Sequence, residues 1–283
     1  MVSVIFSHEN LRPLPEYPVY PPYHVGEYME DYFYKRFINE TPDITRDFIG
    51  ISWTTLYCDN KRRYLQSFLN SLPRDGKYFT ILQHDDAPQE YLPTDTICFS
   101  AGGNVIRHGI VPIPLLCSRI ITKSLGYTDR PILASFVGST THPIRNRMTQ
   151  SCLNDKDIVI NIKGWTPIVQ QDQFVAFVEL GNKSIFSLCP RGYGANSFRI
   201  YEVMQLGSIP VIITDRPYLP WTDELDWTEF SVLITEDQIP NIPTILRSYS
   251  SEKINQMRNK IADVYPKYFT MGGMYDNIIK RIV

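Results

Sequence analysis

One segment of the chain combines a strand, a glycine-containing loop and a helix in an order that suits anion binding. It covers residues 184–215 and ends in a second strand. Gly192 and Gly194 allow the backbone to approach a ligand closely. Asn196 or Ser197 is a suitable N-cap, and the N–H groups and positive end of the helix that follows favour an anion. The pattern predicts a phosphate site at the start of this helix.

Three charged residues flank the same loop. Arg191 stands at the end of the predicted strand, where a guanidinium group can bind a phosphate in a fork. Arg199 and Glu202 are three residues apart and share one face of the predicted helix. A carboxylate inside a phosphate site is typical of a group that binds ribose hydroxyls. The alternative is a surface ion pair on a βαβ unit that binds nothing.

A second strand, loop and helix covers residues 132–152 and carries Gly138, Arg145 and Arg147. Cations in the first turns of a helix oppose the helix dipole. This local conflict indicates an anionic ligand, and solvated arginines are the alternative.

The elements that position these residues alternate along the chain. Helices are predicted at 26–38, 61–71, 143–152, 167–180, 197–206, 243–249, 252–264 and 273–283, and strands at 2–6, 48–53, 77–82, 95–99, 132–137, 157–162, 184–189 and 209–214. This alternation is typical of parallel sheets with helices on both faces. We place a boundary in the aperiodic stretch near residue 125, which predicts Rossmann-like domains at 1–125 and 126–283. The last helix, near 273–283, is expected to pack back on the first domain.

Composition excludes several classes of protein. The 283 residues are 43% hydrophobic and carry a formal charge of −2, which argues against binding nucleic acid through a basic field. No apolar run reaches the length of a membrane span, and the start lacks a signal peptide. Five cysteines without a C-x-x-C pair argue against disulfides and zinc and favour a reducing compartment. We therefore expect a cytoplasmic protein.

Several motifs together resemble one family of enzymes. They are Cys-Pro-Arg-Gly-Tyr-Gly at 189–194, Glu-Val-Met-Gln-Leu-Gly-Ser-Ile-Pro-Val-Ile at 202–212 and Thr-Asp-Arg-Pro-Tyr-Leu-Pro-Trp at 214–221. The run resembles the signature of the exostosins, glycosyltransferase family 47, and the resemblance is dense over residues 134–262.

This resemblance implies a GT-B fold, in which two Rossmann-like domains face a central cleft. It also implies an inverting transfer of a sugar from a UDP-sugar, with the donor in the C-terminal domain and neither a metal nor another cofactor. Arg145 and Arg191 would hold the diphosphate, and Glu202 the ribose. The predicted donor-binding residues are Arg145, Arg191, Gly192, Tyr193, Gly194, Asn196, Ser197, Arg199 and Glu202.

Inversion needs a general base for the acceptor hydroxyl, and strand ends of the N-terminal domain should supply it. His84, Asp85 and Asp86 resemble the His-Asp pair that follows a strand in the family. We predict Asp85 as the base, then Asp86, then His84, with Glu9 after the first strand as a further candidate. The alternative for this trio is an N-cap or a turn ion pair.

Five further residues concern acceptor binding, a metal motif and a helix cap. Tyr20 and Tyr23 lie in a proline-rich loop and are weaker candidates for acceptor binding, with a rigid packing arm as the alternative. Asp155 and Asp157 precede a strand and are interpreted as a loop rather than as the metal motif of the GT-A fold. Asp226 is expected near a short helix that it could cap.

The donor sugar is not encoded by any residue that we can identify. The compact chain is similar to soluble family members encoded by large DNA viruses of green algae, including xylose-transferring ones. This implies UDP-xylose and a glycan acceptor, in N-glycan synthesis on glycoproteins. The alternatives are UDP-glucuronate, UDP-galactose or UDP-GlcNAc as donor, a non-catalytic module that binds UDP or a glycan, and a nucleotide-sugar hydrolase or epimerase.

Overall fold

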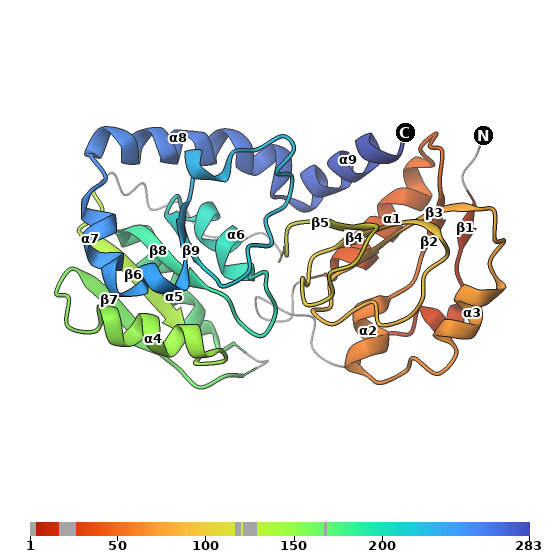
Figure 1. Ribbon diagram of the computed structural model, residues 1–283, viewed down its shortest axis with the longest axis horizontal. Helices are drawn as coiled ribbons and strands as arrows, with labels where there is room; N and C mark the ends of the chain where they lie inside the picture. The colour runs from red at the N-terminus through yellow and green to blue at the C-terminus, as the bar shows by residue number, and fades with distance from the viewer. Residues whose placement is uncertain (1–3, 17–26, 117–119, 121–128, 167–168) are drawn as a thin grey trace. The chain divides into compact units, whose positions relative to one another are not determined.

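The computed structural model describes residues 4–16, 27–116, 120, 129–166 and 169–283. The chain divides into two compact units, which we describe separately (Figure 1). The first comprises Met1–Ser118 and Thr270–Val283, and the second is Arg119–Phe269. The predicted boundary between residues 125 and 126 lies outside the described residues.

Strands and helices alternate in both units, as the sequence pattern predicted. The strands are β1 (Ile5–Phe6), β2 (Asp47–Ile49), β3 (Lys77–Leu82), β4 (Asp95–Ser100), β5 (Ile110–Pro112), β6 (Ile132–Gly138), β7 (Ile158–Ile162), β8 (Ser184–Pro190), β9 (Ile209–Ile213) and β10 (Val232–Ile234). The α-helices are α1 (Met29–Glu40), α2 (Trp53–Cys58), α3 (Leu65–Ser71), α4 (Pro143–Cys152), α5 (Gln171–Lys183), α6 (Phe198–Gln205), α7 (Ile242–Arg247), α8 (Ser251–Tyr268) and α9 (Met271–Ile282). The 3-10 helices are η1 (Glu9–Leu11), η2 (Trp227–Glu229) and η3 (Glu236–Asn241).

The first unit is built on a parallel sheet with the order β1-β2-β3-β4-β5. Side chains along a strand alternate between the two faces, so Phe48 and Phe79 reach one face of the sheet together. Their rings stack with centroids 4.9 Å apart, and Phe33 and Phe37 of α1 pack on both. This aromatic layer holds α1 on that face.

The opposite face of the same sheet is covered by α2 and α3. Leu56 and Leu65 are fully buried in one apolar cluster with Tyr78. The indole N–H of Trp53 donates to the Thr80 hydroxyl at 2.8 Å, so the polar atom of this buried ring is satisfied. The first unit is therefore a sheet with helices on both faces.

The last helix, α9, belongs to the first unit although it follows the second in sequence. Figure 1 shows it beside α1, and the two helices are in contact. The Tyr275 ring lies 4.7 Å from that of Phe33, and Arg36 pairs with Asp276 at 2.8 Å. The buried ring contributes more than this ion pair, because Asp276 is exposed and exposed pairs stabilise little.

The second unit is a parallel sheet with the order β10-β9-β8-β6-β7, which Figure 1 shows between α4 and α8. Pro190 at the end of β8 lies opposite Ile213 at the end of β9. Gly138 at the end of β6 lies opposite Ile162 at the end of β7. The carboxyl ends of these strands therefore share one edge, and ligands of open α/β sheets bind beyond that edge.

Aromatic side chains join α6, η2 and α8 in the core of the second unit. The Phe269 ring lies 5.3 Å from Trp227, 5.5 Å from Tyr201 and 6.0 Å from Phe230, measured between centroids. All four residues are buried. This cluster packs α6, the helix that follows the glycine loop, against the end of α8.

The fold class is the predicted one, α/β with two Rossmann-like parallel sheets, as in GT-B proteins. The prediction of a strand over residues 48–53 was wrong in its second half, because β2 ends at Ile49 and Trp53 begins α2. Aromatic and β-branched residues around Trp53 are typical of strands, but burial of this ring against Thr80 overrides that propensity. The short strands β5 and β10 were not predicted.

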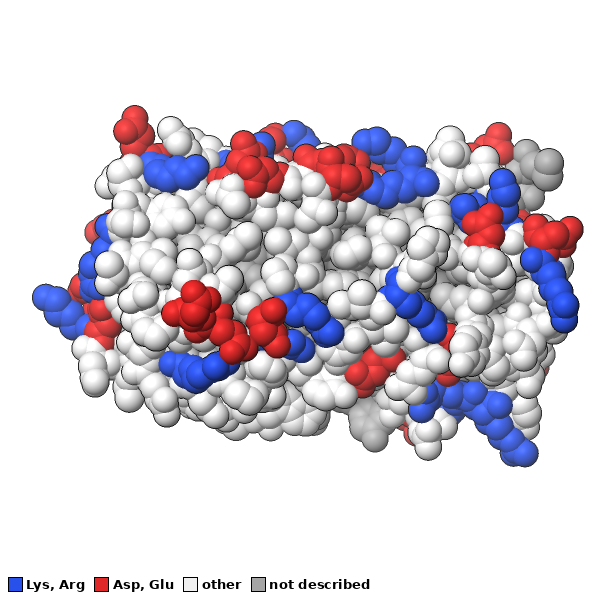
Figure 2. Space-filling view, viewed as in Figure 1, with Lys and Arg blue, Asp and Glu red and all other residues white. Residues whose placement is uncertain are grey.

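The surface carries both signs of charge. Figure 2 shows basic and acidic side chains interspersed over the visible face, without one sign dominating it. Across the part of the chain that the structure describes, no helix combines the length and apolarity that a membrane crossing requires.

Candidate functional site

Arg191 follows β8 directly and is only 8% exposed. Its guanidinium donates to Asp215, after β9, at 2.7 Å, and to the backbone oxygen of Tyr193 at 3.1 Å. The hydrogen bond from Arg191 lowers the pKa of Asp215 below its usual range. A cation held so firmly at the carboxyl edge of the sheet is suited to bind an anion without reorganising.

Arg145 joins the loops that follow β6 and β8. It lies in the first turn of α4, and its guanidinium donates to the backbone oxygens of Ser139 and Arg191, both at 2.9 Å. A third, longer contact reaches the oxygen of Pro190 at 3.4 Å. The charge of Arg145 opposes the dipole of α4, but carbonyl groups of both loops accept hydrogen bonds from it. These bonds offset part of the unfavourable placement of a cation at the start of a helix.

Gly192 packs closely against this guanidinium. A Cβ at position 192 would lie 3.0 Å from Nη2 of Arg145 and 3.7 Å from the Thr141 hydroxyl. Such a contact is tighter than van der Waals packing favours, so a side chain at position 192 would press on the Arg145 guanidinium; the predicted close approach to a ligand stays a prediction. Thr141 was not a predicted site residue, although it lies in the same hydroxyl-rich loop.

The start of α6 is ordered by an amide side chain. Ser197 occupies the N-cap position, but its hydroxyl makes no capping hydrogen bond. Instead Oδ1 of Asn196 accepts the backbone N–H of Ser197 at 2.9 Å and the Tyr201 hydroxyl at 3.1 Å. The loop residues Gly194 and Asn196 are buried, whereas Tyr193 is 64% exposed. The loop therefore presents one exposed aromatic ring beside an ordered helix N-terminus.

Arg199 and Glu202 form the predicted pair on α6, with 3.3 Å between Nε and Oε2. Arg199 also donates to the backbone oxygen of Val137 and stacks over the Phe177 ring. The Glu202 side chain is only 12% exposed, and its burial raises its pKa, an effect that Arg199 partly offsets. The predicted ion pair is thus present and half-buried at the sheet edge, and whether it binds a ligand stays a prediction.

Contacts bring the charged residues of α4 and α6 to the same strand ends. Arg145 donates to the backbone oxygen of Arg191 after β8, and Arg199 donates to the backbone oxygen of Val137 in β6 and pairs with Glu202. The structure therefore brings the predicted donor-site residues of the two loops to the same edge of the sheet. Their roles toward a ligand remain predictions.

Two residues of this edge were not predicted. Asp215 is the second residue after β9, and this position after a strand was the signal that could have identified it. His142 is the N-cap of α4, where its Nδ1 accepts the N–H of Ile144 at 3.3 Å. Burial and the charge of Arg191 lower the pKa of His142, so its neutral form is favoured.

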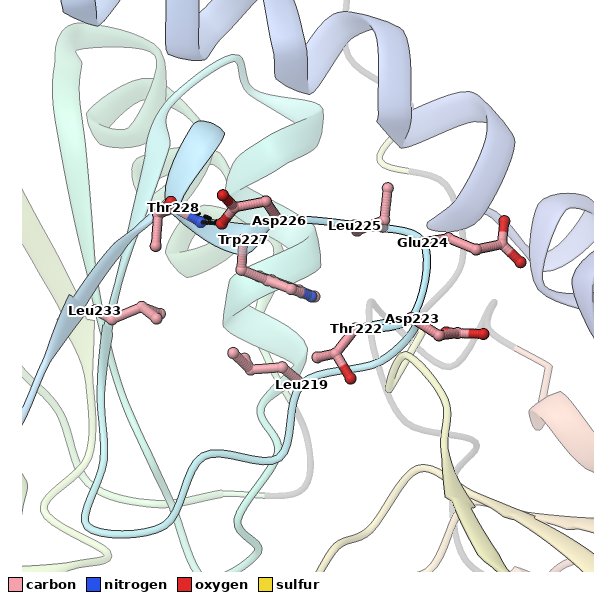
Figure 3. Close-up of a pocket in the computed structure, with 9 residues that line it drawn as sticks. All are labelled: Leu219, Thr222, Asp223, Glu224, Leu225, Asp226, Trp227, Thr228 and Leu233. Carbon is pink, nitrogen blue, oxygen red and sulfur yellow. Dashed lines mark hydrogen bonds between the residues drawn. The ribbon is translucent and has the colours of Figure 1, made fainter.

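A pocket of about 510 Å³ lies under the loop between β9 and β10 (Figure 3). Trp227 forms its apolar wall, and Oδ1 of Asp226 accepts the N–H of Thr228 at 2.9 Å, which confirms Asp226 as a cap. The pocket is lined by Leu219, Thr222, Asp223, Glu224, Leu225, Asp226, Trp227, Thr228 and Leu233.

The predicted base residues follow β3 in the first unit. Oδ1 of Asp86 accepts the amide of Asn104 at 2.9 Å, and the backbone oxygen of Asp85 accepts the Asn104 backbone N–H at 3.1 Å. Nδ1 of His84 accepts the N–H of Asp86 at 3.1 Å. Burial lowers the pKa of His84, which Asp86 partly offsets. A neutral His84 is thus part of the turn, and Asp86 is engaged with Asn104.

The other sequence candidates are less enclosed. Glu9 is exposed and is the first residue of η1, whose N-cap is His8. Tyr20 and Tyr23 lie outside the described residues. Asp155 and Asp157 both bind Arg247, at 2.7 and 2.8 Å, at the amino end of β7, which confirms the loop interpretation.

Two parallel sheets with an arginine-lined glycine loop at the carboxyl edge of one of them define a Rossmann-like protein suited to bind phosphate groups. The exostosin GT47 domain matches residues 96–249, which is more than half of the 283 residues. The chain therefore belongs to the exostosin GT47 family, in agreement with the sequence motifs.

Individual relatives match over shorter stretches. A probable glycosyltransferase of Arabidopsis thaliana is 34% identical over 137 residues, which is 48% of this chain and 25% of the relative. A probable glucuronosyltransferase of Oryza sativa subsp. japonica and a probable β-1,4-xylosyltransferase of Arabidopsis thaliana are each 35% identical over 95 residues, 34% of this chain and 23% of each relative. The chain spans about a quarter of the length of these curated relatives.

Among solved structures, the pneumococcal O-GlcNAc transferase GtfA in complex with UDP and GlcNAc covers 79% of this chain and 47% of its own. The TM-score is 0.44 at 12% identity.

Proposed function

We propose that this protein is an inverting glycosyltransferase that moves xylose from UDP-xylose to a hydroxyl group of a glycan acceptor, in N-glycan synthesis on glycoproteins. The observation that carries the proposal is the pair Arg145 and Arg191, joined by a 2.9 Å hydrogen bond from the first guanidinium to the backbone of the second. Membership of the exostosin GT47 family supports sugar transfer as the reaction class. A xylosyltransferase among the relatives supports xylose as the sugar, and a glucuronosyltransferase makes UDP-glucuronate the main alternative.

The proposed donor site uses the carboxyl edge of the second unit. Arg145 and Arg191 would bind the diphosphate, with N–H groups at the start of α6 as further donors. Glu202 would accept hydrogen bonds from the ribose hydroxyls. We propose that these cations, rather than a metal ion, meet the charge that develops on the leaving UDP.

The proposed reaction forms one bond and breaks one. The acceptor oxygen attacks C1 of the sugar while the bond from C1 to the diphosphate oxygen breaks and both of its electrons leave with UDP. The proton of the acceptor hydroxyl passes to a base, for which we propose Asp85 in the loop after β3. Asp86, whose Oδ1 accepts from Asn104, is the second choice.

Isothermal titration of the full chain tests the donor site. UDP, UDP-xylose, UDP-glucuronate, UDP-galactose and UDP-GlcNAc are titrated with and without EDTA. Arg191→Ala should weaken UDP binding by about 10- to 100-fold, because a charge-assisted contact to phosphate is lost. Arg247→Ala is the matched control, since Arg247 lies at the amino end of β7 and binds Asp155.

Three results would contradict the proposal. Equal UDP affinity of Arg191→Ala and Arg247→Ala would remove Arg191 from the site, and loss of binding in EDTA would require a metal. Donor binding without transfer to any glycan would leave a nucleotide-sugar-binding module.

A further inference from the structure

Glu30 is a buried carboxyl group that the proposed reaction does not use. It stands in the first turn of α1 and is 1% exposed. Oε1 accepts the Thr54 hydroxyl at 2.7 Å and the backbone N–H of Gln83 at 2.8 Å, and Oε2 accepts the Thr54 N–H at 2.9 Å. One carboxyl group thus binds the start of α2 and the end of β3.

Gln83 in turn binds the start of α1. Its side-chain oxygen accepts the backbone N–H of Met29 at 2.9 Å, and the side chain is buried. Glu30 and Gln83 therefore form a reciprocal pair between the start of α1 and the residue that precedes His84. Because both bonds involve backbone N–H groups, they fix the path of the chain and not only two side chains.

The same loop is held from its other side. Asn104 donates its backbone N–H to the oxygen of Asp85 at 3.1 Å and its amide to Asp86 at 2.9 Å. A Cβ on Gly102 would lie 2.3 Å from the backbone oxygen of His84, so the loop passes against a residue that has no side chain. The loop that carries the proposed base is thus fixed at both of its ends.

Burying a carboxyl group at a packing position costs free energy. Burial raises the pKa of Glu30 to about 8, and its hydrogen-bonding partners are the neutral residues Thr54 and Gln83. Its neighbour Asp31 instead pairs with Arg12 at 2.7 Å. Natural sequences break local rules of this kind mainly where function requires the group.

We propose that Glu30 is a positioning residue: by binding the backbone N–H of Gln83 it fixes the loop that carries His84, Asp85 and Asp86. This inference rests on the proposed function, which places the general base in that loop. A displacement of the base by about 1 Å can lower the rate on the order of a hundredfold. Glu30 would therefore affect turnover without touching either substrate.

Steady-state transfer by the full chain, measured well below the melting temperature, tests this role. Glu30→Ala should lower kcat by at least about tenfold while KM for the donor stays within about twofold, because the donor site lies in the other unit. Glu30→Gln keeps an oxygen that can accept from Gln83 and should restore most of kcat. Thr54→Val removes only the hydroxyl bond to Glu30 and serves as a stability control. Glu40→Ala removes an exposed carboxylate at the other end of α1 and should match wild type.

Three results would overturn the inference. They are a kcat for Glu30→Ala within about twofold of wild type, a Glu30→Gln protein no faster than Glu30→Ala, and a Thr54→Val protein that loses as much kcat at an equal loss of melting temperature. Hydrogen exchange distinguishes failure of this inference from failure of the proposed function. If the wild-type chain transfers no sugar, faster exchange in residues 83–86 of Glu30→Ala still supports the positioning contact, and unchanged exchange rejects it.

Discussion

Replacement of Arg145 by lysine tests whether one guanidinium group holds two loops together at the donor edge. Its N–H groups reach the backbone oxygens of Ser139 and Arg191 at 2.9 Å and that of Pro190 at 3.4 Å. A lysine ammonium is a compact donor that cannot reproduce a fork of this width. In Arg145→Lys we expect at least two of the three carbonyl groups to lose this partner.

The size of the effect follows from these contacts. A hydrogen bond from a charged donor contributes about 1.5–3 kcal/mol, and a lost bond costs less where water can replace it. The two 2.9 Å bonds then amount to about 2–3 kcal/mol, and the 3.4 Å contact adds little. For a unit of about 150 residues, this predicts a melting temperature lower by about 4–12 °C.

Thermal unfolding of the full chain, followed by circular dichroism, measures this shift. The control is Arg147→Lys, on the same helix, where Arg147 pairs with Glu236 at 2.6 Å and both side chains are exposed. Exposed pairs contribute less than about 1 kcal/mol, so this variant should melt within about 2 °C of wild type. Equal melting temperatures for the two variants would refute the assignment of Arg145 as the link between the loops.

Three further predictions concern other residues. Gly192→Ala places a Cβ 3.0 Å from Nη2 of Arg145, so UDP affinity measured by calorimetry should fall by about 1 kcal/mol; unchanged affinity would mean that the loop yields without cost. Asp85→Asn should keep UDP affinity and lose transfer in a glycan assay, and full activity would move the base to another residue. Burial raises the pKa of Glu30 from 4.5 to about 8, so the folded state holds this proton more tightly; the resulting stability is complete below pH 4.5 and is lost as the pH rises through 8, on the order of 3–5 kcal/mol. The free energy of unfolding of Glu30→Gln should accordingly fall less than that of wild type between about pH 4.5 and 8, and parallel curves in urea titrations would contradict this.

The sequence predicted the parallel sheets and one edge of the candidate site because both depend on local patterns. Strand and helix periodicity located β8 and α6, and the glycine and arginine between them marked the edge where Arg191 lies. The partners of these residues depend on chain segments far apart in sequence. The bond from Arg191 to Asp215 follows from the register of β8 with β9, which periodicity does not encode.

Glu30 shows the same limit more strongly. In the sequence it is one of several charged residues at the start of an amphipathic helix, where acidic residues are common for dipole reasons. Its burial depends on Thr54 and Gln83, which are 24 and 53 residues away. A similar dependence on tertiary contacts turned the expected strand around Trp53 into α2.

The return of α9 to the first unit has a consequence for the order in which the protein folds during synthesis. The ring of Tyr275 completes the aromatic layer around Phe33, so the first unit lacks part of its core until residues 271–282 have been made. The second unit, residues 119–269, is complete in sequence before then. Domains generally fold as units while the chain emerges from the ribosome. The half that is synthesised first is thus finished last, and its phenylalanine layer stays incomplete until α9 has been made.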